Sequence, residues 1–174
     1  MGGKIQKIKI QVTKCTKCEL SETRNNSVPG KGNYKADVIF VGEAPGKNED
    51  MKGEPFIGIA GKKLAMALES AGVTREEVYI TNIVKCRPPK NRVPTTTEKN
   101  TCQNYLEKEI DIIKPKIICI LGNTAFSSLL NGNEITKFRG KIAKKNNQLY
   151  FLSVHPAATI YNQKLISVLK KDMR

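Results

Sequence analysis

The sequence predicts an α/β fold, a three-layer αβα sandwich around a central four-stranded, mainly parallel sheet. Two observations support this prediction. Short apolar runs alternate with segments that carry apolar residues at helical spacing, as in chains that cover both faces of a parallel sheet with helices. The chain also lacks internal repeats, low-complexity tracts and linkers that would divide it. The four runs span residues 38–41, 78–81, 117–121 and 149–154.

Each apolar run ends in polar or turn-forming residues. The first breaks into Gly42-Glu43-Ala44-Pro45-Gly46, the second leads to Asn82, the third to Gly122-Asn123-Thr124 and the fourth to His155-Pro156. Ligand sites of open α/β sheets lie at the carboxyl ends of the strands. We therefore expect Glu43, Asn82 and His155 to meet along one edge of the sheet, together with Phe56 from the loop that follows the first strand.

Apolar stripes between the runs predict the helices. The last helix follows the fourth strand, and Asn123 or Thr124 is the expected cap of the third helix. We interpret the stripes as core-facing rather than functional. Their members are Leu64, Ala67, Leu68 and Ala71; Leu106, Ile110 and Ile113; Phe126, Leu129 and Leu130; and Leu165, Val168 and Leu169.

Length and hydropathy predict one domain spanning residues 1–174. The chain has 174 residues, of which 39% are hydrophobic, enough for one independent core. The lysine-rich N-terminus does not resemble a signal peptide, and no apolar run approaches the roughly 18 residues of a membrane span. We expect a cytoplasmic, nucleoid-associated protein with no membrane contact.

The charge predicts a polyanionic partner. Thirty Lys and Arg residues face sixteen Asp and Glu residues, giving a formal net charge of +14. Nucleic acid is the leading candidate. A surface adapted for solubility or heat resistance is the alternative, but such surfaces usually balance the two signs. The basic residues gather in two loop segments: Lys85, Arg87, Lys90 and Arg92; and Lys137, Arg139, Lys141, Lys144 and Lys145.

Five cysteines in an apparently intracellular chain indicate chemistry other than disulfides. Cys15 and Cys18 form a CxxC pair, and Cys86 and Cys102 supply two more thiols from a distant segment, with Cys102 expected to open the helix that carries Leu106. Four such thiolates suit either zinc or an iron–sulfur cluster, and the spacing does not choose between them. Cys119 lies within an apolar run and is expected to be a small buried residue.

The motifs together resemble one family, the family 4 uracil-DNA glycosylases. They occur in the family's order from Cys15 past His155, and their combination is far more specific than any one alone. The resemblance implies an αβα sandwich, a structural [4Fe-4S] cluster on the four cysteines, and hydrolysis of the N-glycosidic bond of uracil in DNA during base excision repair. The matching segments are residues 42–46, Glu49-Asp50, residues 55–58, Asn82, residues 85–89, Asn91-Arg92 and residues 155–158.

By this resemblance the strand-end residues form a uracil pocket. Phe56 is expected to stack on the flipped base, and the Asn82 amide to pair with N3–H and O4 of uracil but not with cytosine. His155 is expected to donate to uracil O2 as negative charge develops there. The resemblance places Glu49 beside C5, where a thymine methyl would collide. Gly42, Glu43, Ala44 and Pro45 complete the predicted substrate contacts.

Two positions depart from the family pattern. The best-known relatives carry an aspartate at the position of Ala44, so the neighbouring Glu43 is the predicted catalytic carboxylate, and its backbone rather than its side chain is the alternative contact. The usual leucine or arginine wedge is also absent. Ile160 or Tyr161 is expected to fill the gap left by the flipped base, with a loop-anchoring role as the alternative.

Uracil-containing DNA is the predicted substrate. The protein is expected to bind it as a monomer, with Arg87 and Arg92 on the surface that faces DNA, and to contact replication or repair proteins.

Two other function classes remain open. A metal-stapled nucleic-acid-binding module explains the charge and cysteines but leaves Glu43, Asn82 and His155 unused. A glycosylase with another base preference explains everything except the match of Asn82 to uracil.

Overall fold

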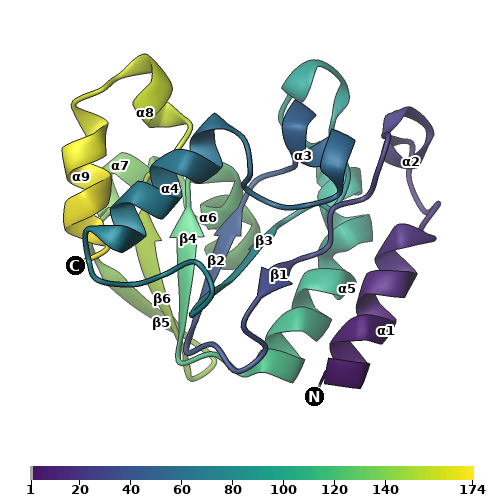
Figure 1. Cartoon of the computed structure of the whole chain (residues 1–174), viewed down its shortest axis with the longest axis horizontal. Coiled ribbons are helices and arrows are strands. Elements are labelled where there is room, and N and C mark those ends of the chain that lie inside the picture. Colours follow the sequence, from purple (N-terminus) through teal and green to yellow (C-terminus); the bar gives the residue numbers. More distant parts are fainter. Residues whose placement is uncertain (1) are drawn as a thin grey trace.

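Four parallel strands form the centre of the sheet, as the sequence predicts (Figure 1). The computed structural model describes residues 2–174. Strand β2 pairs with β3 and β4, and β4 pairs with β6, so the four carboxyl ends lie at one edge. The strands are β2 (Val38–Gly42), β3 (Tyr79–Asn82), β4 (Ile117–Leu121) and β6 (Gln148–Ser153).

The predicted number of four strands is wrong, because two antiparallel strands extend the sheet. Strand β1 (Lys31–Gly32) pairs with β3, and β5 (Ile142–Lys145) pairs with β6, giving the order β1-β3-β2-β4-β6-β5. Neither has a long apolar run. β1 is two residues long, and β5 is largely exposed, with lysines at two of its four positions.

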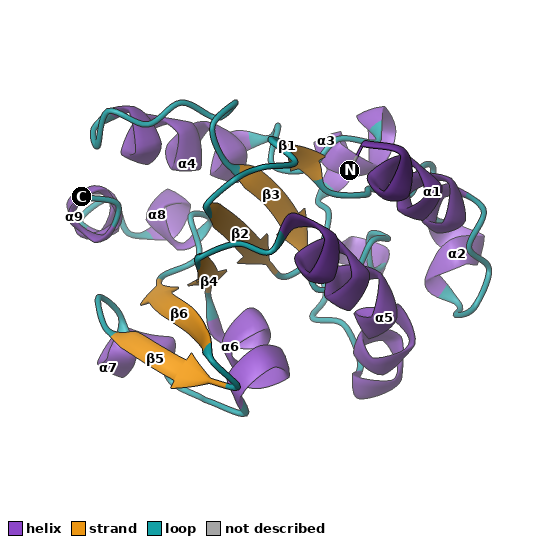
Figure 2. Cartoon of the chain, turned by 90° about the horizontal axis from the view of Figure 1, so that it is seen from below, coloured by secondary structure: helices purple, strands orange, loops and turns teal. Residues whose placement is uncertain are grey.

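Helices cover both faces of the sheet, which confirms the predicted sandwich (Figure 2). Helices α4, α8 and α9 lie on one face, and α1, α5 and α6 on the other. The helices are α1 (Gly2–Thr13), α2 (Leu20–Thr23), α3 (Lys47–Lys52), α4 (Ile59–Glu69), α5 (Thr96–Ile113), α6 (Asn123–Leu130), α7 (Ile135–Phe138), α8 (Ala158–Tyr161) and α9 (Leu165–Asp172), with a 3₁₀ turn at Pro89–Asn91.

Helix α1 was not predicted. Its buried residues Ile5, Ile8 and Val12 recur at helical spacing and join the core cluster that includes α5 residues, but four polar or charged residues lie between them and two glycines precede them. Within residues 2–174, no helix is both long enough and apolar enough to cross a membrane.

Two helix starts also differ from prediction. Helix α5 begins at Thr96, six residues before Cys102, behind a capping box formed by Thr95 and Glu98. Helix α6 begins after Gly122 without a side-chain cap, so the predicted Asn123 or Thr124 cap is wrong. Both side chains make other contacts, because Asn123 Oδ1 accepts from the Ile135 amide (2.7 Å) and the Thr124 hydroxyl donates to Glu43.

Candidate active site

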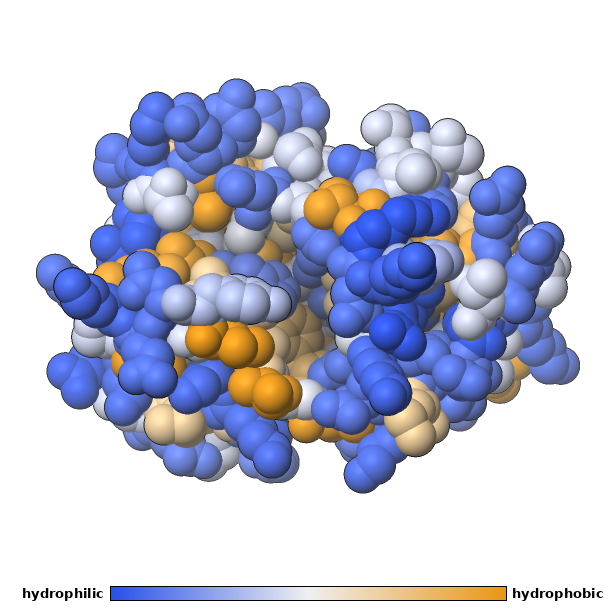
Figure 3. All heavy atoms as spheres, turned by 90° about the horizontal axis from the view of Figure 1, so that it is seen from above, coloured by the Kyte–Doolittle hydropathy of each residue, from blue (hydrophilic) through white to orange (hydrophobic). Residues whose placement is uncertain are grey.

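A pocket of about 520 Å³ opens at the carboxyl ends of β2 and β3. Figure 3 shows this face, with a hollow at its centre, mostly hydrophilic surroundings and apolar residues along part of its rim. The sequence-predicted residues that line the pocket are Glu43, Ala44, Pro45, Glu49, Phe56, Asn82, Arg92, His155, Ile160 and Tyr161. The fold thus brings together residues that are more than 100 positions apart in the chain.

Phe56 forms an apolar wall of the pocket and is held in an unusual backbone conformation. Its φ is 52°, in the left-handed region that non-glycine residues rarely adopt, and Arg75 donates hydrogen bonds to the carbonyls of Pro55 and Phe56. A Cβ on Gly42 would lie 2.5 Å from Phe56 Cζ, and a Cβ on Gly61 would lie 1.8 Å from the Phe56 carbonyl oxygen. Both glycines are therefore required by close approach.

Asn82 presents an unpaired acceptor beside Phe56. It is the last residue of β3, stands in register with Gly42 and is only 2% exposed. Its Oδ1 atom is buried, and residues 2–174 supply it with no hydrogen-bond partner. Because a buried oxygen without a partner costs on the order of 1–3 kcal/mol, a ligand N–H at this point would recover that free energy.

His155 faces Phe56 across the pocket, with 5.7 Å between ring centroids and an interplanar angle of 31°. The Ala157 amide donates to His155 Nδ1 (3.1 Å), so this nitrogen carries no proton. Burial lowers the pKa of His155 to about 4, although the nearby Glu49 carboxylate acts in the opposite direction. The imidazole is therefore neutral near pH 7, with its proton on Nε2 as a donor.

The lowered pKa predicts acid-sensitive stability. Because the pKa of His155 falls from 6.5 to about 4 on folding, the unfolded chain binds the extra proton between these pH values. The contribution is complete above pH 6.5 and is lost as the pH falls toward 4. Denaturant unfolding at about pH 7 and about pH 5 should show a larger loss of stability for the parent than for His155→Gln. Equal losses would contradict the shift.

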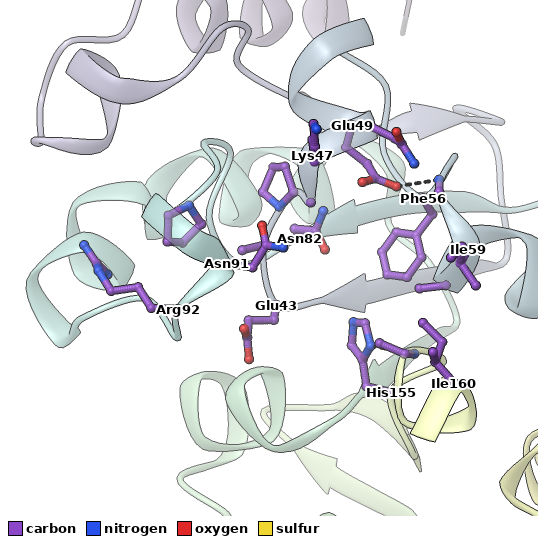
Figure 4. A pocket seen from close by; sticks show the side chains of 18 of the residues that line it. Glu43, Lys47, Glu49, Phe56, Ile59, Asn82, Asn91, Arg92, His155 and Ile160 are labelled. Carbon is purple, nitrogen blue, oxygen red and sulfur yellow. Dashed lines mark hydrogen bonds between the residues drawn. The ribbon is translucent and has the colours of Figure 1, made fainter. Parts of the chain in front are cut away.

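Glu49 holds the loop that carries Phe56. Its buried carboxylate accepts hydrogen bonds at Oε1 from the amides of Ile57 (2.9 Å) and Gly58 (2.7 Å), as Figure 4 shows in part. A Cβ on Gly46 would lie 2.8 Å from Glu49 Oε2, so the pocket wall fits closely around this group. Glu49 thus has a visible structural task in addition to its place in the pocket lining.

Glu43 lines the pocket but points away from Asn82 (Figure 4). Its Oε2 accepts a hydrogen bond from the Thr124 hydroxyl on α6, and its carbonyl accepts from the Val84 amide (3.2 Å). Ala44 and Pro45 continue the same wall. Figure 4 places Phe56, Asn82 and His155 around one space, with Glu43 at its lower side.

Comparison with known proteins decides the family. Residues 29–173 match the model of the uracil DNA glycosylase superfamily. The chain is 46% identical to the type-4 uracil-DNA glycosylase of Sulfurisphaera tokodaii, over 98% of this chain and 82% of that protein. It is 42% identical to the type-4 uracil-DNA glycosylase of Archaeoglobus fulgidus, over 94% of this chain and 87% of that protein. The chain belongs to the type-4 uracil-DNA glycosylases.

The four cysteines of this glycosylase gather on one side of the sheet, away from the pocket at the strand ends. Cys15, Cys18, Cys86 and Cys102 all line a second, small cavity between α1, α2 and α5. The Arg24 guanidinium donates to Cys86 Sγ (2.9 Å), and the Lys85 amide donates to Cys102 Sγ (3.3 Å). Burial raises the pKa of Cys102 to about 12.

The donor chemistry fits an iron–sulfur cluster. Four thiols without a histidine surround the cavity, and donors to sulfur are the contacts that tune such clusters. Across residues 2–174, no three His, Cys, Asp or Glu side chains stand close enough to bind a single metal ion. Cys119 lies apart, buried in β4 as expected.

The predicted DNA-contacting residues differ in their surroundings. Arg87 is on the surface, where its Nε donates to Asn91 Oδ1 (2.7 Å). Arg92 lines the pocket at the strand ends but is held by Glu98 through two hydrogen bonds of 2.9 and 2.7 Å. Ile160 and Tyr161 lie on α8 at the pocket, and Tyr161 is 90% exposed.

Sequence reasoning missed several residues that support the glycosylase pocket. Lys85, predicted as part of a basic surface loop, is 1% exposed and paired with Glu109, so that prediction is wrong. Thr124 holds Glu43, and Arg75 holds the Phe56 loop. Arg75 lies 19 positions from its partner, and no local pattern marks such a contact.

Proposed function

We infer that this chain removes uracil from DNA by hydrolysing the N-glycosidic bond and leaving an abasic site. Type-4 family membership supports the activity, and the observation that carries the base assignment is the buried, unpaired Oδ1 of Asn82. This oxygen suits the N3–H of uracil, and the amide NH₂ suits O4. Cytosine has an acceptor at N3, which would leave the buried oxygen unpaired.

The reaction begins with extrusion of the nucleotide. Flipping costs a few kcal/mol and costs least at a mispaired base such as uracil opposite guanine. Phe56 offers a ring on which the base stacks, an interaction on the order of 1–3 kcal/mol. Asn82 then fixes the edge of the base. Glu49 closes the wall of the pocket, and we propose that it excludes the thymine methyl at C5.

Cleavage breaks the bond between the sugar C1′ and N1 of uracil. The base leaves with the electron pair, the sugar gains oxocarbenium character, and water supplies the oxygen that ends on C1′. Neutral His155, with its proton on Nε2, donates to uracil O2 and stabilises the departing anion. Glu43 is the carboxylate proposed to orient the water. The Thr124 hydrogen bond fixes one of its oxygens.

A base-release assay tests the function. The enzyme should release free uracil from oligonucleotides containing U opposite G and leave matched oligonucleotides containing C or hypoxanthine intact. Release of hypoxanthine without uracil would indicate a glycosylase of another base preference. DNA binding without any base release would indicate a binding module. Either result would overturn the assignment.

We also propose that Cys15, Cys18, Cys86 and Cys102 hold a structural [4Fe-4S] cluster. When bound, the cluster joins the segment between α1 and α2 to the loop after β3 and to α5. Helices α1 and α2 already bury Ile5, Ile8, Val12 and Leu20 in the core, and this crosslink would stabilise them further and complete a single domain over residues 1–174. No chemical step of the reaction passes through it.

Iron analysis tests the cluster. Protein purified without oxygen should be brown and contain about four irons per chain, and Cys102→Ala should lose both iron and thermal stability. Cys119→Ser is the matched control, because Cys119 is buried in β4 outside the cysteine cavity. It should keep the iron. A colourless parent with one zinc per chain would contradict the proposal.

The salt dependence of binding tests the DNA face. We propose that Arg87 contacts phosphate and that Ile160 or Tyr161 fills the gap in the duplex. Arg87→Ala should weaken DNA binding and lower the slope of log K against log salt by about one, without changing base preference. Lys35→Ala, which removes the same charge from an exposed loop before β2, should leave the slope unchanged. Arg92→Ala is less informative, because it also removes a partner of the α5 capping residue Glu98.

A further inference from the structure

A buried lysine lies directly behind the residue proposed to read the base. Lys85 and Glu109 are each 1% exposed, and Lys85 Nζ lies 2.7 Å from Glu109 Oε2. Charged pairs are rarely buried so completely, because desolvation offsets most of their attraction. The mechanism proposed above uses neither group.

The ammonium group of Lys85 reaches the main chain of Asn82. Lys85 Nζ donates to the Asn82 carbonyl (3.0 Å) and to the Thr81 hydroxyl, in addition to Glu109. These three acceptors match its three N–H donors. Lys85 therefore folds back on the end of β3 and binds the two residues on which the strand terminates.

Glu109 fixes the other side of the ammonium group. Its carboxylate accepts from the Thr81 hydroxyl (2.8 Å), the Tyr79 hydroxyl (3.2 Å) and the Gly30 amide (2.9 Å). Burial beside Glu109 raises the pKa of the Tyr79 hydroxyl, which keeps it a donor. Every polar group in the network thus has a partner, the condition under which a buried network becomes rigid.

The sheet leaves this point otherwise unsupported. Strand β2 runs beside β3 as far as Asn82, but β1 pairs only with Tyr79 and Ile80. Among residues 2–174, no strand therefore lies on the outer side of Thr81 and Asn82, and Lys85 lies there instead. The main chain of Lys85 is itself fixed, since its amide donates to Cys102 Sγ (3.3 Å) and its carbonyl accepts from the Val28 amide (2.6 Å).

We propose that Lys85 is a positioning residue for base recognition: by holding the Asn82 carbonyl, it fixes the direction in which the Asn82 amide enters the pocket. The inference rests on the proposed role of Asn82 in reading uracil. If the Asn82 amide is displaced by up to about one ångström, the reaction rate falls even though no group that contacts substrate has been removed.

The test replaces the whole ion pair so that no buried charge remains alone. Lys85→Met combined with Glu109→Gln should slow single-turnover uracil release at least ~10-fold and narrow the preference for U over C, while DNA affinity and iron content stay at parental values. If this variant does not fold, Lys85→Gln with Glu109→Gln keeps two amides in place of the pair. Ile113→Ala, a cavity in the same helix α5, is the control for lost stability and should excise uracil at the parental rate.

A double-mutant cycle separates positioning from general weakening. If Lys85 acts through Asn82, adding the Lys85 and Glu109 changes to Asn82→Ala should slow excision by less than ~2-fold further. The proposal would be overturned if the rate losses of the two sets of changes multiplied independently. It would also be overturned if the variant with both Lys85 and Glu109 replaced excised uracil at the parental rate with unchanged base preference. Failure of the proposed function would be distinguishable, because the parental enzyme itself would then release no uracil.

Discussion

The Asn82→Asp enzyme should lose most uracil excision and gain slow excision of cytosine. The substitution replaces the amide NH₂, the proposed donor to uracil O4, with an oxygen. A carboxyl group in this position, only 2% exposed, is expected to keep its proton, since burial disfavours the charged form. Unlike the amide, whose NH₂ and oxygen are fixed, the protonated group can carry its proton on the oxygen nearest N3, so it can donate to cytosine N3 and accept from the cytosine amino group.

Single-turnover kinetics on matched oligonucleotides containing U or C would measure the change in base preference. Asn33→Asp makes the same chemical change in a turn distant from the pocket, where Oδ1 accepts only from the Lys35 amide (2.9 Å). It should excise uracil at the parental rate. An Asn82→Asp enzyme that does the same would mean that Asn82 does not read the base, and the pocket assignment would be wrong.

His155→Ala should slow uracil excision by ~100-fold or more without creating a new base preference. Removal of the imidazole takes away the proposed donor to the departing uracil anion, an interaction expected to strengthen as the bond breaks. The loss should therefore appear in the rate of the chemical step more than in substrate binding. Rapid-quench measurements at saturating enzyme, together with DNA affinity, would separate the two.

His155→Gln provides the matched comparison. A glutamine amide can donate a hydrogen bond but cannot reproduce the ring contact with Phe56, so part of the lost rate should return.

The pKa of His155, about 4, also predicts how excision depends on pH. The imidazole is neutral throughout the range from about pH 6 to pH 8, so titration of His155 should not change the excision rate of the parent in this range. A loss of rate smaller than ~3-fold in His155→Ala would remove His155 from the reaction.

Parallel strand ends made the central fold and the candidate site predictable from sequence. Asn82 follows an apolar run that is buried throughout, and His155 follows an apolar run that is buried toward its carboxyl end. In a parallel sheet the ends of such runs share one edge, so residues far apart in the chain can be grouped from the order of the runs alone. The family resemblance then supplied the chemical roles, which the strand pattern does not contain.

Contacts with weak local signals were not predictable. Strand β1 is too short to show alternation, and β5 carries exposed lysines. The burial of Lys85 depends on Glu109, which lies 24 positions away on α5. The neighbours of Lys85 in the sequence, an apolar residue and a cysteine, do not indicate that this lysine is buried. In each case a partner from another element outweighs the preference of the residue itself.

The close approaches at Gly42 and Gly61 constrain how this pocket can diverge over evolutionary time. A side chain at Gly42 would meet both the Phe56 ring and Asn82 Oδ1 (2.6 Å), and one at Gly61 would meet the Phe56 main chain. Any substitution of either glycine therefore adds a side chain that disrupts the wall formed by Phe56. A new base preference is therefore expected to arise through Asn82, the residue proposed to read the base, while the two glycines are retained.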